Sequence, residues 1–197
     1  LGAHSEVWSE LDTAIPAFTK DVEAFKSELS KQQTAWKKQK TSNGELKKAV
    51  DRLSILAESS RNLVKQTDLL FKLSTRLIET CENECSARES GSWSGKEITK
   101  ARKLADEARS LAVEQLKQVR YFWKQAHWLT ERFPEAKLCD VEGLVKLVNR
   151  TEIKANDWSL TPGRYVGVAP EEEDEDFDFE KLCAKSTLNS KTSTPRL

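Results

Sequence analysis

Residues 46–88 decide the fold, and they read LKKAVDRLSILAESSRNLVKQTDLLFKLSTRLIETCENECSAR without one glycine or proline. Apolar or small side chains recur in this stretch every three or four residues, which is the spacing of one face of an α-helix. At 1.5 Å per residue, a helix of this length extends over more than about 50 Å. The stretch therefore predicts one long amphipathic helix, whose stripe consists of Leu46, Val50, Leu53, Leu56, Ser60, Leu63, Thr67, Leu70, Ser74, Leu77 and Cys81.

A second long helix is expected after the Ser- and Gly-rich stretch 90–95. Ser94 and Glu97 have the spacing of a capping box, in which two side chains satisfy free backbone N–H groups at a helix start. Pro134 ends this helix. Two long helices joined by so short a turn lie side by side and antiparallel. The expected core stripe is Ile98, Ala101, Leu104, Ala108, Leu111, Gln115, Val119, Phe122, Ala126, Leu129 and Phe133.

A third helix is expected upstream, over residues 16–40, with Pro16 in its first turn, where proline is well tolerated. Its apolar stripe is Phe18, Val22, Phe25, Leu29 and Trp36. A loop follows, and Ser42 and Glu45 again have capping-box spacing at the start of the next helix.

Residues 135–170 have a different character. Asp140 is placed to cap a short helix over residues 141–149, and Pro162-Gly163 suits the two central positions of a type II turn. Eight of the ten residues 171–180 are acidic, and the remaining end is rich in Ser, Thr and Lys, so we expect disorder over 171–197. The predicted class is all-α: long antiparallel helices form a coiled-coil-like bundle over 1–134, with a short helix and turn packed on it over 135–170 and an extended C-terminal segment.

The composition excludes several classes of protein. The formal net charge is zero, and residues 1–170 hold 24 acidic against 28 basic residues, a mild excess that does not by itself indicate nucleic-acid binding. No apolar run is long enough to span a membrane, and the N-terminus does not resemble a secretory signal. Four scattered cysteines predict a reducing cytoplasm and not a disulfide framework. Because the sequence contains no methionine, we expect it to be part of a longer protein.

The residues that enzymes need for chemistry are mostly absent from the sequence. It contains two histidines, and it has neither a phosphate-binding GxxxxGK[ST] loop, nor a GxGxxG loop, nor the [DN]PP[YF] motif of amino-methylating enzymes. Cys81 and Cys85 lie one helical turn apart, but a zinc site requires four ligands. Asn149-Arg150-Thr151 fits a glycosylation acceptor by chance, since no secretory signal precedes it. We therefore assign no catalytic, cofactor-binding or metal-binding residue.

Two clusters have more than one interpretation. Lys37, Lys38 and Lys40 beside Trp36, with Lys47 and Lys48 beyond the loop, form either a surface for a nucleic-acid backbone or a solvated helix end. In the aromatic segment 121–128, Phe122 continues the core stripe, whereas Trp123, His127 and Trp128 point to other sides. That segment is either covered by residues 135–170 or a docking surface for another protein.

The C-terminal third of the chain resembles a known family. Residues 156–179 read NDWSLTPGRYVGVAPEEEDEDFDF, and with DVEGLVK at 140–146 and TEIKAN at 151–156 they are similar to the C-terminal region of the modification (M) subunit of bacterial type I restriction-modification systems. The specific similarity covers about residues 119–180. The upstream helices match this family only as a helical region.

The resemblance implies an adenine-specific DNA methyltransferase that uses S-adenosylmethionine and assembles with a specificity (S) subunit and a restriction subunit, reaching DNA through the complex. The catalytic domain of such a protein, with its cofactor loop and [DN]PP[YF] motif, would lie upstream of this sequence. The family also continues after the acidic run into a long helix that packs on the S subunit, whereas residues 181–197 here become polar. The resemblance therefore implies a helical module for subunit assembly and DNA clamping, without catalysis of its own.

The turn at residues 161–165 is the most specific expectation. Pro162 restricts one backbone dihedral and Gly163 permits a positive φ, so the turn would place Arg164 and Tyr165 at a contact with the methyltransferase domain or a partner subunit. Trp158 and Leu160 would anchor the segment on the bundle. Alternatively, the turn is structural and Tyr165 packs on Trp123 or Trp128.

A different class of protein also fits the helices: a free-standing antiparallel coiled-coil adaptor or structural protein.

Overall fold

The computed structural model describes residues 2–168. The chain divides into two units, one up to Leu138 and one from Cys139 onward, and each is described here by itself. Helices dominate the described residues, which contain no β-strand beyond an isolated bridge between Val141 and Val145. The predicted all-α class is confirmed. The expected disorder of 171–197 concerns residues outside the described range.

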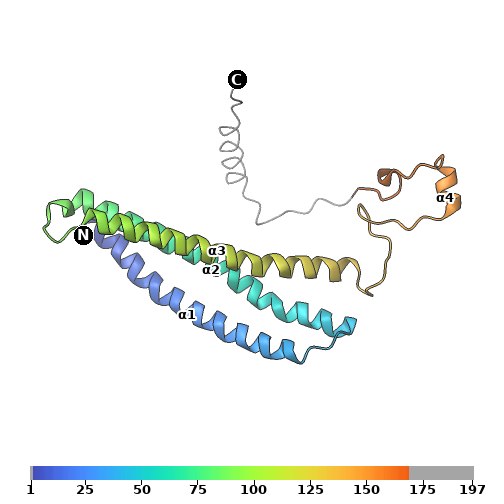
Figure 1. Cartoon of the computed structure of the whole chain (residues 1–197), viewed down its shortest axis with the longest axis horizontal. Helices are drawn as coiled ribbons and strands as arrows, with labels where there is room; N and C mark the ends of the chain where they lie inside the picture. Colours follow the sequence, from blue (N-terminus) through green and yellow to red (C-terminus); the bar gives the residue numbers. More distant parts are fainter. Residues whose placement is uncertain (1, 169–197) are drawn as a thin grey trace, which may run out of the picture. The chain divides into compact units, whose positions relative to one another are not determined.

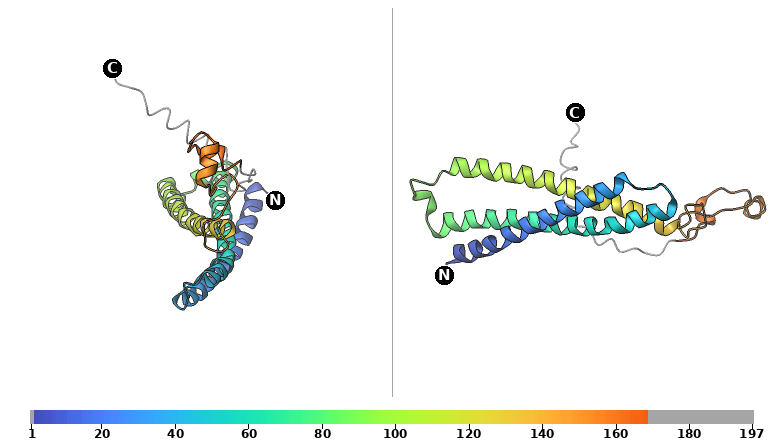
Figure 2. Two further views of the ribbon diagram at one scale, coloured as in Figure 1. Left: turned by 90° about the vertical axis from the view of Figure 1, so that its right-hand side faces the viewer. Right: turned by 90° about the horizontal axis from the view of Figure 1, so that it is seen from below.

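Three long helices make up the first unit: α1 (Ala3–Lys37), α2 (Asn43–Glu84) and α3 (Gly95–Arg132). Figure 1 and Figure 2 show α2 alongside both of the others, and α1 and α3 pack along α2 far more than on each other. Because α2 is covered on two sides, most of the buried side chains belong to it: Ala49, Leu56, Ala57, Ser60, Leu63 and Leu73. Among the described helices, none is long and apolar enough to cross a membrane.

Helix α1 begins at Ala3, thirteen residues before the predicted start at Pro16. Val7 and Leu11 form a buried cluster with Leu73 of α2, and this packing holds the first turns of α1 in place. Pro16 lies on the exposed side of the helix interior, where its missing N–H costs one intrahelical hydrogen bond. The prediction was wrong because burial of the preceding apolar stripe outweighs that loss.

Ion pairs between α2 and α3 show how the two helices are aligned. Arg120 pairs with Glu58, Arg109 with Asp68 at 2.7 Å, and Arg102 with Glu79 at 3.8 Å. Positions that rise along α2 meet positions that fall along α3, so the two helices run in opposite directions. Arg109 also pairs with Asp106 and lies over the Phe71 ring, and the two carboxylates raise its pKa.

The face of α3 that packs on α2 differs from the predicted stripe. Val113 is buried there, between the arginines that pair with α2, while Leu104, Leu111, Phe122 and Leu129 are exposed. The prediction was wrong because arginine can pack its aliphatic stem against a neighbouring helix while its guanidinium pairs with a carboxylate. The predicted stripe is thus only partly turned toward α2: Ile98, Ala101 and Ala108 line an apolar groove beside α2, whereas the four large residues named above are exposed.

The helix ends agree partly with the expected caps. The Ser94 hydroxyl accepts a hydrogen bond from the Glu97 backbone N–H, whereas the Ser42 side chain makes no cap hydrogen bond at the start of α2. Helix α2 ends at Glu84, four residues before the predicted end, because Ser86 adopts a left-handed conformation with φ 48°. A short 3₁₀ turn, η1 (Ala87–Glu89), then leads toward α3.

The second unit contains a short helix, α4 (Arg150–Ala155), and a 3₁₀ turn, η2 (Pro162–Arg164). The predicted helix over 141–149 is absent: Val141 and Val145 form a bridge, and Gly143 has φ 73°. The cap of α4 is Asn149, which forms a full capping box with Glu152. The residue read as a chance glycosylation acceptor is thus the one that starts the helix.

Asp140 closes the 140–147 loop instead of capping a helix. Its carboxylate pairs with the Lys146 ammonium and accepts a hydrogen bond from the Leu147 N–H at 2.8 Å. Lys146 and the Leu147 amide lower the pKa of Asp140, which ordinarily lies near 3.9. A lowered pKa means that the carboxylate stabilises the loop at higher pH, and this contribution is lost as pH falls through the folded-state pKa.

We expect the Asp140 carboxyl to titrate below about pH 3.9 in the folded chain. The Leu147 amide resonance should shift in the same acidic range, because its acceptor becomes protonated. NMR titration of the full chain measures both. In Asp140→Asn, which keeps an acceptor oxygen but cannot titrate, the Leu147 shift should be independent of pH over that range. An Asp140 titration at or above the ordinary aspartate pKa would contradict the assignment.

Candidate functional site

The predicted partner-binding residues lie in both units. Trp123, His127 and Trp128 are in the last third of α3, and Trp158, Pro162, Gly163, Arg164 and Tyr165 follow α4. The first group is positioned by the α2–α3 pair. The second is positioned by hydrogen bonds within its own loop.

Trp123 faces α2. Its indole Nε1 donates a hydrogen bond to the Val50 carbonyl oxygen at 3.0 Å, and the ring is half-buried. Its neighbour Phe122, which was expected in the core, is exposed and makes an edge-to-face contact with Tyr121 at 5.5 Å between centroids. Trp123 therefore serves the packing of the unit, and Phe122 is available to a partner.

His127 and Trp128 each contact other side chains of α3. The His127 ring stacks near Trp123 with 5.0 Å between centroids, and its Nδ1 is 3.9 Å from a carboxylate oxygen of Glu131. The Arg132 guanidinium lies 4.4 Å from the centre of the Trp128 ring, within cation–π range. The Trp128 ring is half-buried, and aromatic and arginine side chains of this kind are enriched at protein contact surfaces.

The loop at 161–165 is a 3₁₀ turn and not the predicted type II turn. The Arg164 N–H donates to the Thr161 carbonyl at 3.1 Å, and the Tyr165 N–H donates to the Pro162 carbonyl at 2.9 Å. Positive φ values among the glycines of this unit occur at Gly143 and Gly167, and not at Gly163. The prediction was wrong because Pro-Gly also fits consecutive right-handed turns, in which glycine needs no positive φ.

Two side chains brace this loop from within. The Tyr165 hydroxyl donates to the Ser159 carbonyl at 2.5 Å, and the Arg164 guanidinium donates to the Asn156 carbonyl at 3.3 Å. Trp158 has φ 59°, a strained conformation for a bulky residue, and its N–H bonds to the Ile153 carbonyl at the end of α4. The loop is thus held in one shape while Trp158 and Leu160 remain 56% and 76% exposed.

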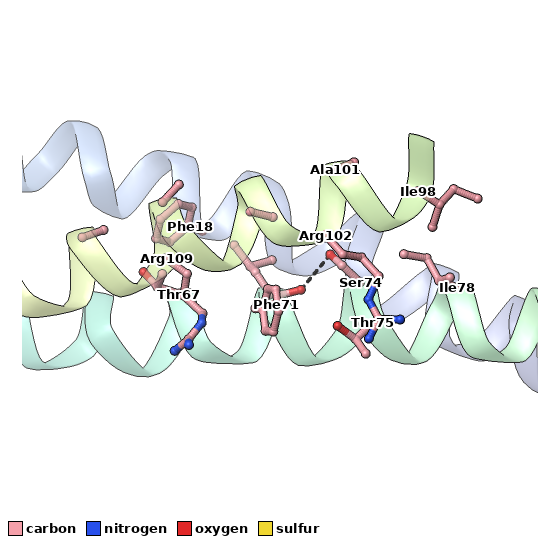
Figure 3. A pocket seen from close by; sticks show the side chains of 14 residues that line it. Phe18, Thr67, Phe71, Ser74, Thr75, Ile78, Ile98, Ala101, Arg102 and Arg109 are labelled. Atoms are coloured by element: carbon pink, nitrogen blue, oxygen red, sulfur yellow. Dashed lines mark hydrogen bonds between the residues drawn. The ribbon is translucent and has the colours of Figure 1, made fainter. Parts of the chain in front are cut away.

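An apolar groove of 520 Å³ opens between the three long helices (Figure 3). Its floor is α2, around Phe71 and Ser74, and Phe18 of α1 contributes to its lining. The α3 side is a series of alanines, which leaves the groove open: Ala101, Ala105, Ala108 and Ala112. The groove could not be predicted from the sequence, because three helices that are distant in sequence form it, and two of these alanines, Ala101 and Ala108, were expected in the core stripe.

The lysines near Trp36 gather at the bend between α1 and α2. Trp36 is exposed and lines a second apolar groove, of 460 Å³, with Leu29 and Leu53. At the start of α2, Lys48 hydrogen-bonds the Glu45 carboxylate and lowers its pKa, and Lys40 adds to this effect. The bend therefore combines positive charge with an exposed aromatic ring.

Among residues 2–168, no group of His, Cys, Asp or Glu side chains is arranged to hold a metal ion. Burial and the adjacent Cys85 raise the pKa of the Cys81 thiol, which disfavours the thiolate that binds metals. Comparisons of the chain with protein-family models, with curated proteins and with solved structures give no match.

Proposed function

We propose that this chain is the C-terminal helical part of the M subunit of a type I restriction-modification adenine-specific DNA methyltransferase, in the cytoplasm. In this proposal it serves subunit assembly and DNA clamping, and S-adenosylmethionine binds to the catalytic part of the parent enzyme. The observation that carries the proposal is the run of residues 156–179, which resembles that family over consecutive positions. Its described part, up to Val168, is a braced loop with exposed side chains, which suits a docking element.

Assembly with the S subunit is assigned to the loop around Arg164. The guanidinium is exposed and its hydrogen bond to the Asn156 carbonyl is long, at 3.3 Å, so its other donors can reach a partner carboxylate. The Arg150 guanidinium lies 5.8 Å from the centre of the Trp158 ring. The exposed Trp158 side chain offers an apolar surface in the same unit as Arg164. DNA clamping is assigned to the lysines at the α1–α2 bend, because ammonium groups beside an exposed aromatic ring suit a phosphate backbone.

Two experiments test the proposal. The DNA upstream of the Leu1 codon should encode, in frame, a cofactor loop and a [DN]PP[YF] motif. In addition, Arg164→Ala in the intact M subunit should weaken assembly with its S subunit about tenfold, as loss of an interface arginine commonly does. Lys154→Ala, which removes an exposed cation from α4, is the matched control and should leave assembly unchanged.

An upstream frame without methyltransferase motifs would contradict the proposed family. If Arg164→Ala unfolds its loop but leaves assembly and methylation intact, the loop is structural and the assigned contact is wrong. Loss of the Tyr165–Ser159 hydrogen bond, observed by NMR, reports that unfolding.

The alternative function is a free-standing coiled-coil adaptor or structural protein. The exposed apolar face of α3 favours it, because such a face is common where helices pair between chains. The upstream DNA separates the two functions.

A further inference from the structure

The outward face of α3 carries a straight row of large apolar side chains. Leu104, Leu111, Phe122 and Leu129 are 56%, 61%, 66% and 53% exposed. With 3.6 residues per turn, the four positions lie within about 20° of one line along the helix. Val113, which is buried on the α2 side, lies on the opposite face. The row is therefore directed away from the rest of the three-helix unit.

No charged residue interrupts the row between its first and last members. The positions that complete the stripe are Ala108, Gln115, Gln118 and Ala126. A solvated helix face normally carries charges, and a contiguous apolar face usually indicates a binding surface.

The row has the same spacing from both ends. Its four large members are separated by 7, 11 and 7 residues, and the two central glutamines lie symmetrically between the inner pair. A second α3 that runs in the opposite direction therefore places large side chains opposite large side chains and amides opposite amides. Such self-complementarity is the property of a two-fold interface.

We propose that a second copy of this chain covers the row through antiparallel pairing of the two α3 helices. In this register Leu104 faces Leu129 of the second copy, Leu111 faces Phe122, and Gln115 faces Gln118. The amides at the centre can hydrogen-bond to each other, and a polar layer of this kind fixes the register of paired helices.

The flanks of the row select the antiparallel direction. Glu107 and Glu114 lie along one flank, where the second copy supplies Gln125 and Gln118 as amide donors. The other flank holds small side chains, Ala101, Ala112 and Val119, which permit close approach of the helices, and its two alanines also line the groove beside α2. A parallel pair would instead place both carboxylates against alanines, which offer no donor, and would leave Glu107 only the Lys103 ammonium of its own chain, at 3.9 Å. The like charges of Lys100 and Arg132 of the second copy meet at the ends of the row, where water screens them.

Sedimentation velocity of the full 197-residue chain tests the pairing. We expect a concentration-dependent dimer. Leu111→Glu and Phe122→Glu should each weaken it roughly 100-fold or more, because the two-fold axis places every substitution in the interface twice. Both side chains are exposed in the single chain, so the helix content measured by circular dichroism should not change. Ile55→Glu on α2, where Ile55 is 57% exposed, is the matched control and should leave the dimer intact.

Distances between spin labels test the direction. With the native cysteines replaced by serine, a label at position 118 should lie close to its counterpart in the second copy. Labels at position 100 should be about 50 Å apart along the helix axis at 1.5 Å per residue. Short distances at both positions would show a parallel pair and overturn the proposal. So would a monomer up to about 100 μM or equal dissociation by Ile55→Glu.

Discussion

Leu63→Ala is expected to lower the free energy of unfolding by about 3 kcal/mol. Leu63 lies on α2 and is 3% exposed, so its truncation removes buried apolar area and leaves a cavity that the flanking helices fill incompletely. Urea denaturation followed by circular dichroism at 222 nm measures the change.

Leu69→Ala is the matched control for this substitution. It makes the same change on the same helix at a side chain that is 48% exposed, and it should cost less than about 1 kcal/mol. Similar losses for the two variants would contradict the assigned core of α2.

Val7→Asp is expected to lower the free energy that holds the first turns of α1 in place by about 3–5 kcal/mol. It places a carboxylate without a partner in a site that is fully buried. Val7 packs with Leu11 and Leu73, and these contacts explain why α1 extends upstream of Pro16. Amide hydrogen exchange should therefore accelerate in residues 3–15.

Ile15→Asp introduces the same charge one residue before Pro16, at a side chain that is 48% exposed, and exchange should stay near the wild-type rate. If Val7→Asp leaves the protection of residues 3–15 unchanged, the upstream turns of α1 are not held by this cluster.

The long helices could be predicted from the sequence, because their apolar periodicity is uninterrupted and their ends carry turn residues. The start of α1 could not, since proline is common both in the first turn of a helix and, at a cost, inside one that is held by packing. The helix predicted over 141–149 failed for a local reason: Asp140 bonds the Leu147 amide across a loop, and Asn149 is the better cap.

The residue types of the candidate site could be predicted from the sequence, but the directions in which their side chains point could not. Phe122 and Trp123 are adjacent, and only the position of α2 decides that the indole faces Val50 while Phe122 stays exposed. The apolar groove beside Phe18 was not predicted, because it requires three helices that are distant in sequence. For Pro162-Gly163, the residues indicate a turn but not which of two turn types forms.

The central place of α2 has a consequence for unfolding. Because α1 and α3 each pack mainly on α2, either outer helix can detach while the other remains in place. Protection against exchange should then be highest along α2 and should differ between α1 and α3, and a substitution in one outer helix should not affect the other. Openings of α1 alone and of α3 alone are therefore expected at lower free energies than the global unfolding that urea denaturation measures.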